Sequence, residues 1–171
     1  MVILGVDPGL NATGFGVIEI APTAALCVLA AGALRPSRAL PLAERLAVIH
    51  RGLTELIRRH RPETMVLEQL FTHSTYVSTA ARMAHARGVA CLAAQEARIQ
   101  TAEYAPARAK QAITGTGAAT KAQVARMVEH WLGRLDPTWS QDATDALALA
   151  IVHAQISRRQ RRLPAGMAGH G

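Results

Sequence analysis

The chain has 171 residues and a formal net charge of +7, and half of its residues are hydrophobic although only 4% are aromatic. This length fits one domain with an aliphatic core, and no apolar run approaches the roughly 20 residues that span a membrane. The basic excess is typical of a protein that binds a polyanion such as nucleic acid, although a merely soluble basic protein has the same balance.

The N-terminus and the cysteines favour a cytoplasmic location. The first residues lack a basic segment, and Asp7 interrupts the only early apolar stretch, so we expect no signal peptide. Cys27 and Cys91 are isolated in the sequence and lack the spacing of metal ligands, so we expect two reduced, buried thiols. These features together predict a cytoplasmic protein.

The first part of the chain is typical of three strands followed by a helix. Apolar and β-branched runs predict strands at residues 2–7, about 14–20 and about 25–34. Their short connections favour antiparallel pairing, and we expect Gly9 and Gly14 to let the chain reverse after the first strand. Pro41 then opens a helix whose apolar side chains recur at helical spacing as far as Ile57.

The rest of the chain predicts two further strands and four helices. The strands are expected at residues 64–70 and 99–104. The helices are expected at about 75–94, after Pro106, from Thr120 to about Leu132, and from Ser140 to about Ser157. The sequence then becomes rich in Arg and afterwards in Pro and Gly, so we expect one domain over residues 1–157 and a basic, disordered tail over residues 158–171.

Four acidic residues lie at the ends of the expected elements. One ends the first strand, one lies near the end of an otherwise apolar strand, and two lie three residues apart at the start of the last helix: Asp7, Glu68, Asp142 and Asp145. A buried carboxylate is costly unless it is paired or binds a metal ion. Two simpler interpretations stay open, because Asp7 could be an ordinary turn residue and Asp142 could complement the helix dipole.

The four acids converge if the first and fourth expected strands are neighbours and the last helix packs against them. Their hard oxygen ligands suit Mg²⁺ or Mn²⁺ rather than zinc. Such a group can hold two ions, one activating a water molecule and one stabilising the leaving oxygen during phosphodiester hydrolysis.

A series of motifs resembles the RuvC family of Holliday-junction resolvases, in family order from residue 2 to about residue 155. The motifs are Ile3-Leu4-Gly5-Val6-Asp7-Pro8-Gly9 with Thr13-Gly14-Phe15-Gly16, Glu68-Gln69-Leu70-Phe71, Ala86-Arg87-Gly88-Val89, Tyr104-Ala105-Pro106, Lys110-Gln111-Ala112 with Gly115-x-Gly117, Lys121-x-Gln123-Val124, and Asp142-Ala143-Thr144-Asp145-Ala146-Leu147-Ala148. The resemblance implies a ribonuclease H-like α/β fold, in which helices flank a five-stranded mixed sheet whose first three strands are antiparallel.

The resemblance also implies an activity. It implies a metal-dependent, structure-specific DNA endonuclease that nicks two opposing strands of a Holliday junction symmetrically, leaving 5′-phosphate and 3′-hydroxyl ends, in recombination and DNA repair. The four acids would be its catalytic residues and would bind two Mg²⁺ ions, for which Mn²⁺ could substitute. The protein would work as a homodimer, together with a branch-migration complex of the RuvA–RuvB type.

Residues outside the acidic group match positions that contact DNA in the family. Lys110 and Lys121 are expected to contact phosphates, and Phe71 is expected to stack on bases. We also assign His73 and Arg87 to the DNA-binding surface. After Phe71 the chain departs from the family pattern, since Thr72-His73-Ser74-Thr75 replaces a second aromatic and a basic–Asn pair. The preferred cleavage sequence therefore does not follow from the resemblance.

Three other functions share part of this pattern. A nucleotide-binding ATPase of the actin and sugar-kinase type has a similar hairpin, but it needs a second domain that 171 residues do not accommodate. A related nuclease that acts on RNA would share Asp7 and the fold but would not explain Phe71 and the two lysines. A catalytically silent junction-binding protein would not require all four acids.

Overall fold

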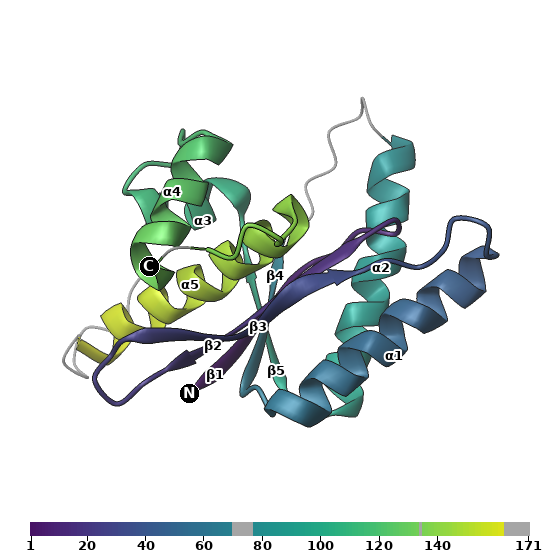
Figure 1. Cartoon of the computed structure of the whole chain (residues 1–171), viewed down its shortest axis with the longest axis horizontal. Helices are drawn as coiled ribbons and strands as arrows, with labels where there is room; N and C mark the ends of the chain where they lie inside the picture. The colour runs from purple at the N-terminus through teal and green to yellow at the C-terminus, as the bar shows by residue number, and fades with distance from the viewer. Residues whose placement is uncertain (70–76, 134, 163–171) are drawn as a thin grey trace, which may run out of the picture.

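A computed structural model of the chain describes residues 1–69, 77–133 and 135–162. Five strands and five helices make up this part of the chain (Figure 1). In chain order they are β1 (Val2–Asp7), β2 (Thr13–Ile20), β3 (Leu26–Leu34), α1 (Leu42–His60), β4 (Thr64–Glu68), α2 (Val77–Glu96), β5 (Gln100–Tyr104), α3 (Pro106–Thr114), α4 (Lys121–Leu132) and α5 (Gln141–Arg162).

The strands form one mixed sheet in the order β3-β2-β1-β4-β5. The pairs β1–β2 and β2–β3 are antiparallel, whereas β1–β4 and β4–β5 are parallel. This arrangement confirms the predicted five-stranded sheet with three antiparallel strands at its start. Because β1 and β4 are parallel neighbours, their carboxyl ends lie at the same edge of the sheet.

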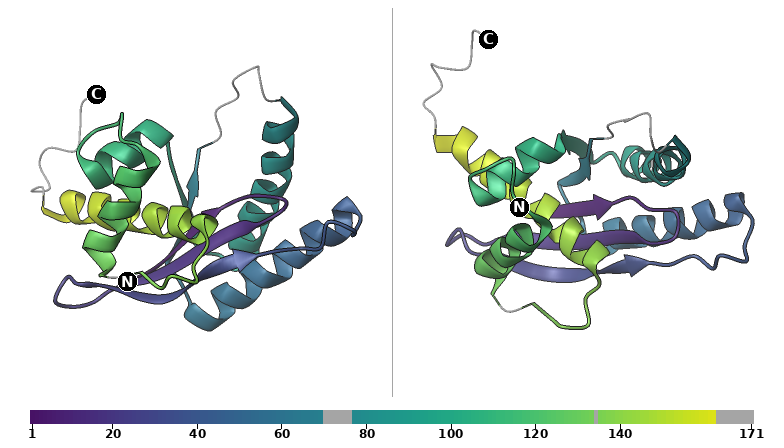
Figure 2. Two further views of the ribbon diagram at one scale, coloured as in Figure 1. Left: turned by 45° about the horizontal axis from the view of Figure 1, so that its top comes forward. Right: turned by 90° about the horizontal axis from the view of Figure 1, so that it is seen from above.

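Helices cover both faces of the sheet. Helices α3, α4 and α5 lie on one face, and α1 and α2 lie on the other (Figures 1 and 2). Strand side chains alternate between the two cores, as the pleat of a strand requires: Ile3, Ile18 and Val66 pack with the α5 side, whereas Leu4, Val17, Met65 and Leu67 pack with the α1 side. The fold is therefore a three-layer sandwich with an aliphatic core on each side of the sheet.

Helix α5 lies directly on the main chain of β1 and β2. A Cβ atom built on Gly5 would lie 2.0 Å from the carbonyl oxygen of Ala146, and one built on Gly14 would lie 2.0 Å from that of Asp142. Any larger residue at either position would push the helix away. These two glycines thus fix the first turns of α5 against the ends of the two strands.

The close approach corrects the role that we predicted for Gly14. Gly14 lies inside β2, opposite Asp7, and not in the turn. Among the described glycines, positive φ angles occur at Gly115 and Gly133, which end α3 and α4. Gly14 is required for the space that α5 occupies, rather than for a turn conformation.

Two further expectations differ from the structure. Helix α5 continues past Ser157 to Arg162, because Arg is a good helix former and its charge is favourable near a helix C-terminus. The predicted burial of the cysteines is wrong, since Cys27 is exposed on the edge strand β3 and Cys91 is only partly buried. None of the described helices combines the length and the apolar character that crossing a membrane requires.

Candidate active site

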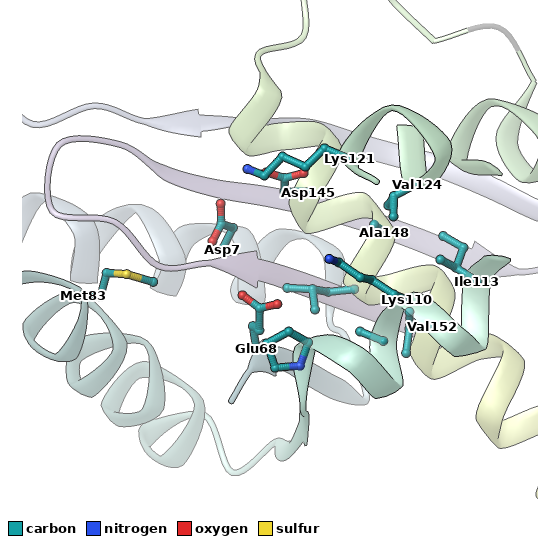
Figure 3. A pocket seen from close by; sticks show the side chains of 13 residues that line it. Asp7, Glu68, Met83, Lys110, Ile113, Lys121, Val124, Asp145, Ala148 and Val152 are labelled. Carbon is teal, nitrogen blue, oxygen red and sulfur yellow. The ribbon is translucent and has the colours of Figure 1, made fainter. Parts of the chain in front are cut away.

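Asp7 and Glu68 end neighbouring parallel strands. The pairing Val6↔Leu67 makes them the next residues on β1 and β4. Figure 3 shows both carboxylates pointing into one pocket beside α5. The register of the sheet therefore sets their separation.

Helix α5 brings a third carboxylate to the same place. Asp145 precedes Ala146, the residue that lies against Gly5 of β1. Asp7, Glu68 and Asp145 line a cavity of about 280 Å³, which we call the acidic pocket (Figure 3). Its inner wall is apolar and comes from three helices: Pro106, Ala109 and Ile113 of α3, Val124 of α4, and Ala148, Leu149 and Val152 of α5.

The carboxylates of the acidic pocket repel one another. Burial, followed by the charges of Asp145 and Glu68, raises the pKa of Asp7 from 3.8 to about 6. Burial and the charge of Asp145 also raise the pKa of Glu68. A positive charge in the pocket would reverse both effects by favouring the ionised carboxylates.

Two lysines already lie at the pocket. Lys110 follows the helix start at Pro106 by one turn, and Lys121 is the first residue of α4, where Thr120 and Gln123 form a capping box. Lys121 Nζ lies 3.7 Å from Asp145 Oδ2, and the charge of Lys110 lowers the pKa of Glu68 against the effect of burial. Both ammonium groups lie beside the acids (Figure 3).

Asp142, the fourth predicted acid, has different neighbours. It lines an adjacent cavity with residues of the β1–β2 connection, which we call the hairpin pocket: Gly9, Leu10, Asn11 and Ala12, with Arg82 and Met83 of α2. Its Oδ2 accepts a hydrogen bond from Arg35 Nη2 at 3.0 Å, which also forms an ion pair. The charge of Asp142 still contributes to raising the pKa of Asp7, after burial and the charges of Asp145 and Glu68. The structure thus gathers three acids in one pocket and holds the fourth beside it.

Arg87, which the sequence predicts to contact DNA, makes two contacts within the protein. Arg87 donates a hydrogen bond of 2.9 Å to the main-chain carbonyl of Glu68 and forms an ion pair with Glu103. Only 14% of its side chain is exposed. It braces the ends of β4 and β5, because its guanidinium group is shared between them. The predicted DNA-binding residues Phe71 and His73 lie outside the described residues.

Sequence reasoning missed two side chains that hold the acids of α5. Arg35 follows β3 and lies 107 residues from Asp142 in the sequence, so no local pattern relates them. Gln141 donates a hydrogen bond of 2.9 Å to Asp145 Oδ1. The four-residue spacing of this second pair is a helical signal that was available in the sequence.

The donor chemistry of the acids fits a divalent cation. Carboxylate oxygens are the ligands that Mg²⁺ and Mn²⁺ prefer, and their mutual repulsion would be relieved by an ion. Within the described ranges, no group of three or more metal-binding side chains is already arranged around one point. Mg²⁺ commonly uses only one or two protein carboxylates and takes its other ligands from water and substrate phosphates, so the acids present suffice.

Comparisons with known proteins identify the family of the chain. The sequence model of the family described as crossover junction endodeoxyribonuclease RuvC matches residues 3–153. The crossover junction endodeoxyribonuclease RuvC of Halorhodospira halophila is 48% identical over 152 residues, which cover 89% of each chain. That of Azorhizobium caulinodans is 43% identical over 152 residues, covering 89% of this chain and 88% of the relative.

Solved structures also include a RuvC protein that is similar to this chain. Thermus thermophilus RuvC in complex with Holliday junction substrate superposes with a TM-score of 0.86 at 33% identity, covering 94% of this chain and 96% of the other. This likeness confirms the predicted ribonuclease H-like fold. On the family match over most of its length and the identity to these relatives, the chain belongs to the RuvC family of crossover junction endodeoxyribonucleases.

Proposed function

We propose that this protein is a Holliday-junction resolvase, a DNA endonuclease that cuts two opposing strands of a four-way junction in recombination and DNA repair. The observation that carries the proposal is the acidic pocket, where Asp7, Glu68 and Asp145 meet next to Lys110 and Lys121. Acids that hold cations and lysines that bind phosphates are what phosphodiester hydrolysis needs. The relative from T. thermophilus that shares this fold was solved in complex with a Holliday junction substrate.

The catalytic residues of this proposal are Asp7, Glu68, Asp142 and Asp145, which would hold two Mg²⁺ ions, with Mn²⁺ able to replace them. Bound Mg²⁺ supplies activation of a water molecule and stabilisation of the leaving 3′ oxygen, which yields 5′-phosphate and 3′-hydroxyl ends. Asp7 and Glu68 fix the position of the ion-binding centre because both end strands of the central sheet. Asp145 adds its carboxylate from the facing helix.

The remaining parts of the pocket would hold the substrate. Lys110 and Lys121 would bind the phosphates on either side of the cleaved bond as point charges. The apolar wall behind the lysines would keep water away from the pocket except at the reacting position. The attraction between the charged residues and the phosphates would be stronger as a result. Phe71 would stack on bases of the opened junction, with His73 nearby, whereas Arg87 would act on the site through Glu68.

Symmetric cleavage requires two active sites, so we propose that the protein is a homodimer in the cytoplasm. We also propose that it receives junctions from a branch-migration complex of the RuvA–RuvB type. Residues 1–157 would form the nuclease domain, and the basic segment 158–171 would be an accessory tail.

The decisive experiment is cleavage of a synthetic four-way junction, beside a linear duplex of the same sequence and an RNA–DNA hybrid, with Mg²⁺ and with EDTA. We expect paired nicks at symmetric positions, in the junction alone and with Mg²⁺ alone. Cleavage of the hybrid would instead assign the protein to RNA processing. Binding without cleavage would make it a silent junction binder.

A further inference from the structure

The main chain of Asp142 is fixed beside Asp7. Gly14 is the cross-strand partner of Asp7 in the β1–β2 pair. A Cβ atom on Gly14 would lie 2.0 Å from the carbonyl oxygen of Asp142 and 3.0 Å from its Cβ atom. The position of Asp142 is therefore set by the sheet, and only its side-chain rotamer decides which neighbour its carboxylate meets.

In this structure the carboxylate meets Arg35. The Nη2–Oδ2 distance is 3.0 Å, and the side chains of Arg35 and Asp142 are 56% and 36% exposed. Asp142 lines the hairpin pocket, whereas Asp7 and Asp145 line the acidic pocket. Arg35 thus binds the carboxylate of a residue whose Cβ atom lies beside Gly14, the cross-strand partner of Asp7.

We propose that Arg35 is a positioning residue that competes with the divalent cation for Asp142. While its guanidinium group holds the carboxylate, the acidic pocket contains three acids. When a cation binds, Asp142 leaves Arg35 and joins them. This inference rests on the proposed metal-dependent function, since it assigns Arg35 to the same metal-binding group.

Electrostatic repulsion explains why such a residue is needed. Without a cation, turning Asp142 toward Asp7 would add a further negative charge to a pocket whose acids already repel one another. The ion pair with Arg35 gives that charge another partner. Because both partners are partly exposed, the pair is weak enough for a cation to break.

The chain offers a matched control three residues away. Arg38 is exposed in the same segment between β3 and α1, and among the residues that the structure describes it has no hydrogen-bond or ion-pair partner. Arg38→Gln removes the same charge as Arg35→Gln without touching Asp142. Comparing the two variants separates the loss of a direct competitor from a general change in the electrostatic field.

The test is a Mn²⁺ titration of the full-length, DNA-free protein, in which electron paramagnetic resonance measures the concentration of free Mn²⁺. Because Arg35→Gln loses the ion pair that competes with the cation, its Mn²⁺ affinity should rise by about two- to fivefold. The Mn²⁺ affinity of Arg38→Gln should equal that of the wild type. Arg35→Lys, which keeps the charge but loses the forked donor, should fall between Arg35→Gln and the wild type. Thermal unfolding without Mn²⁺ checks that each variant is folded.

A double-mutant cycle with Asp142→Asn completes the test. We expect Asp142→Asn to weaken Mn²⁺ binding and to abolish the effect of Arg35→Gln. If Asp142→Asn weakens binding but Arg35→Gln leaves it unchanged or weaker, the role of Arg35 is wrong while the proposed metal site stands. An equal gain in Arg38→Gln would also overturn the role of Arg35. If Asp142→Asn has no effect, the proposed metal-binding group itself is wrong.

Discussion

Asp7 and Glu68 occupy matching positions at the ends of two adjacent parallel strands, so hydrogen bonds of the sheet hold their carboxylates together. The repulsion between them cannot be relieved by moving one strand. It must be relieved by a proton, by a lysine or by a bound cation.

Removing the charge of Asp7 should separate catalysis from binding. Asp7→Asn keeps the size of the side chain but removes the charge of a proposed metal ligand, so we expect junction cleavage to fall by at least about 10³-fold. Junction affinity, measured by gel shift in Ca²⁺, should change less than about threefold, because the lysines remain. Loss of binding in parallel with cleavage would mean that Asp7 is needed for the fold or for DNA contact.

The same substitution should stabilise the ion-free protein above pH 6. The folded-state pKa of Asp7, about 6, exceeds its ordinary value of 3.8. Between these pH values the folded protein binds the proton more tightly than the unfolded chain does, so stability falls as pH rises from about 4 to about 6 and then levels off. Urea unfolding in EDTA should give Asp7→Asn an advantage of at most about 3 kcal/mol at pH 8, which disappears near pH 4. A stability advantage of Asp7→Asn that is constant with pH would show that the surroundings of Asp7 do not raise its pKa.

Gly14→Ala should destabilise the protein through contact with α5. The added methyl group would lie 2.0 Å from the Asp142 carbonyl oxygen, and overpacking of this kind costs about 1–3 kcal/mol. Gly88→Ala is the control, because Gly88 lies within α2 and, in the described part of the chain, no atom outside its own helical turn lies within 4 Å of its Cβ position. That variant should gain up to about 1 kcal/mol in helix stability. Equal effects in urea unfolding would show that α5 can yield at Gly14.

Replacing Arg87 should cost stability and also activity. Arg87→Met leaves the carbonyl group of Glu68 and the carboxylate of Glu103 without their partner, a loss of about 2–4 kcal/mol in unfolding free energy. Arg51→Met, at an exposed position of α1, should change stability by less than about 0.5 kcal/mol. If Arg87 instead contacts DNA, its replacement would reduce junction affinity and leave urea unfolding unchanged.

The lysines should contribute to binding through phosphate contacts. Lys110→Ala should reduce the slope of log affinity against log salt concentration by about 0.9, the contribution of one neutralised phosphate. Arg59→Ala removes a charge from α1, on the opposite side of the sheet, and should leave the slope unchanged. A similar reduction in both variants would indicate non-specific attraction rather than a contact at the active site.

The sequence was sufficient to predict the sheet and the three acids of the acidic pocket. Asp7 and Glu68 each end a hydrophobic strand, and Asp145 interrupts an apolar helix face, so burial arguments single them out without any structure. The pairing of Arg35 with Asp142 could not be predicted, because it depends on how β3 and α5 meet across 107 residues. The internal contacts of Arg87 could not be predicted for the same reason, since a partly buried arginine that binds a carbonyl group has no signature in the sequence.

The contacts of Gly5 and Gly14 have a consequence for how this enzyme tolerates change. Because α5 meets β1 and β2 through main-chain atoms at these points, no side chain acts as a spacer between the helix and the strands. Substitutions among the aliphatic residues of either core can therefore alter packing elsewhere while α5 stays in contact with β1 and β2 at these two points. These two glycine contacts set where Asp142 and Asp145 lie against the sheet. The aliphatic core can therefore change during evolution while the acids keep their positions.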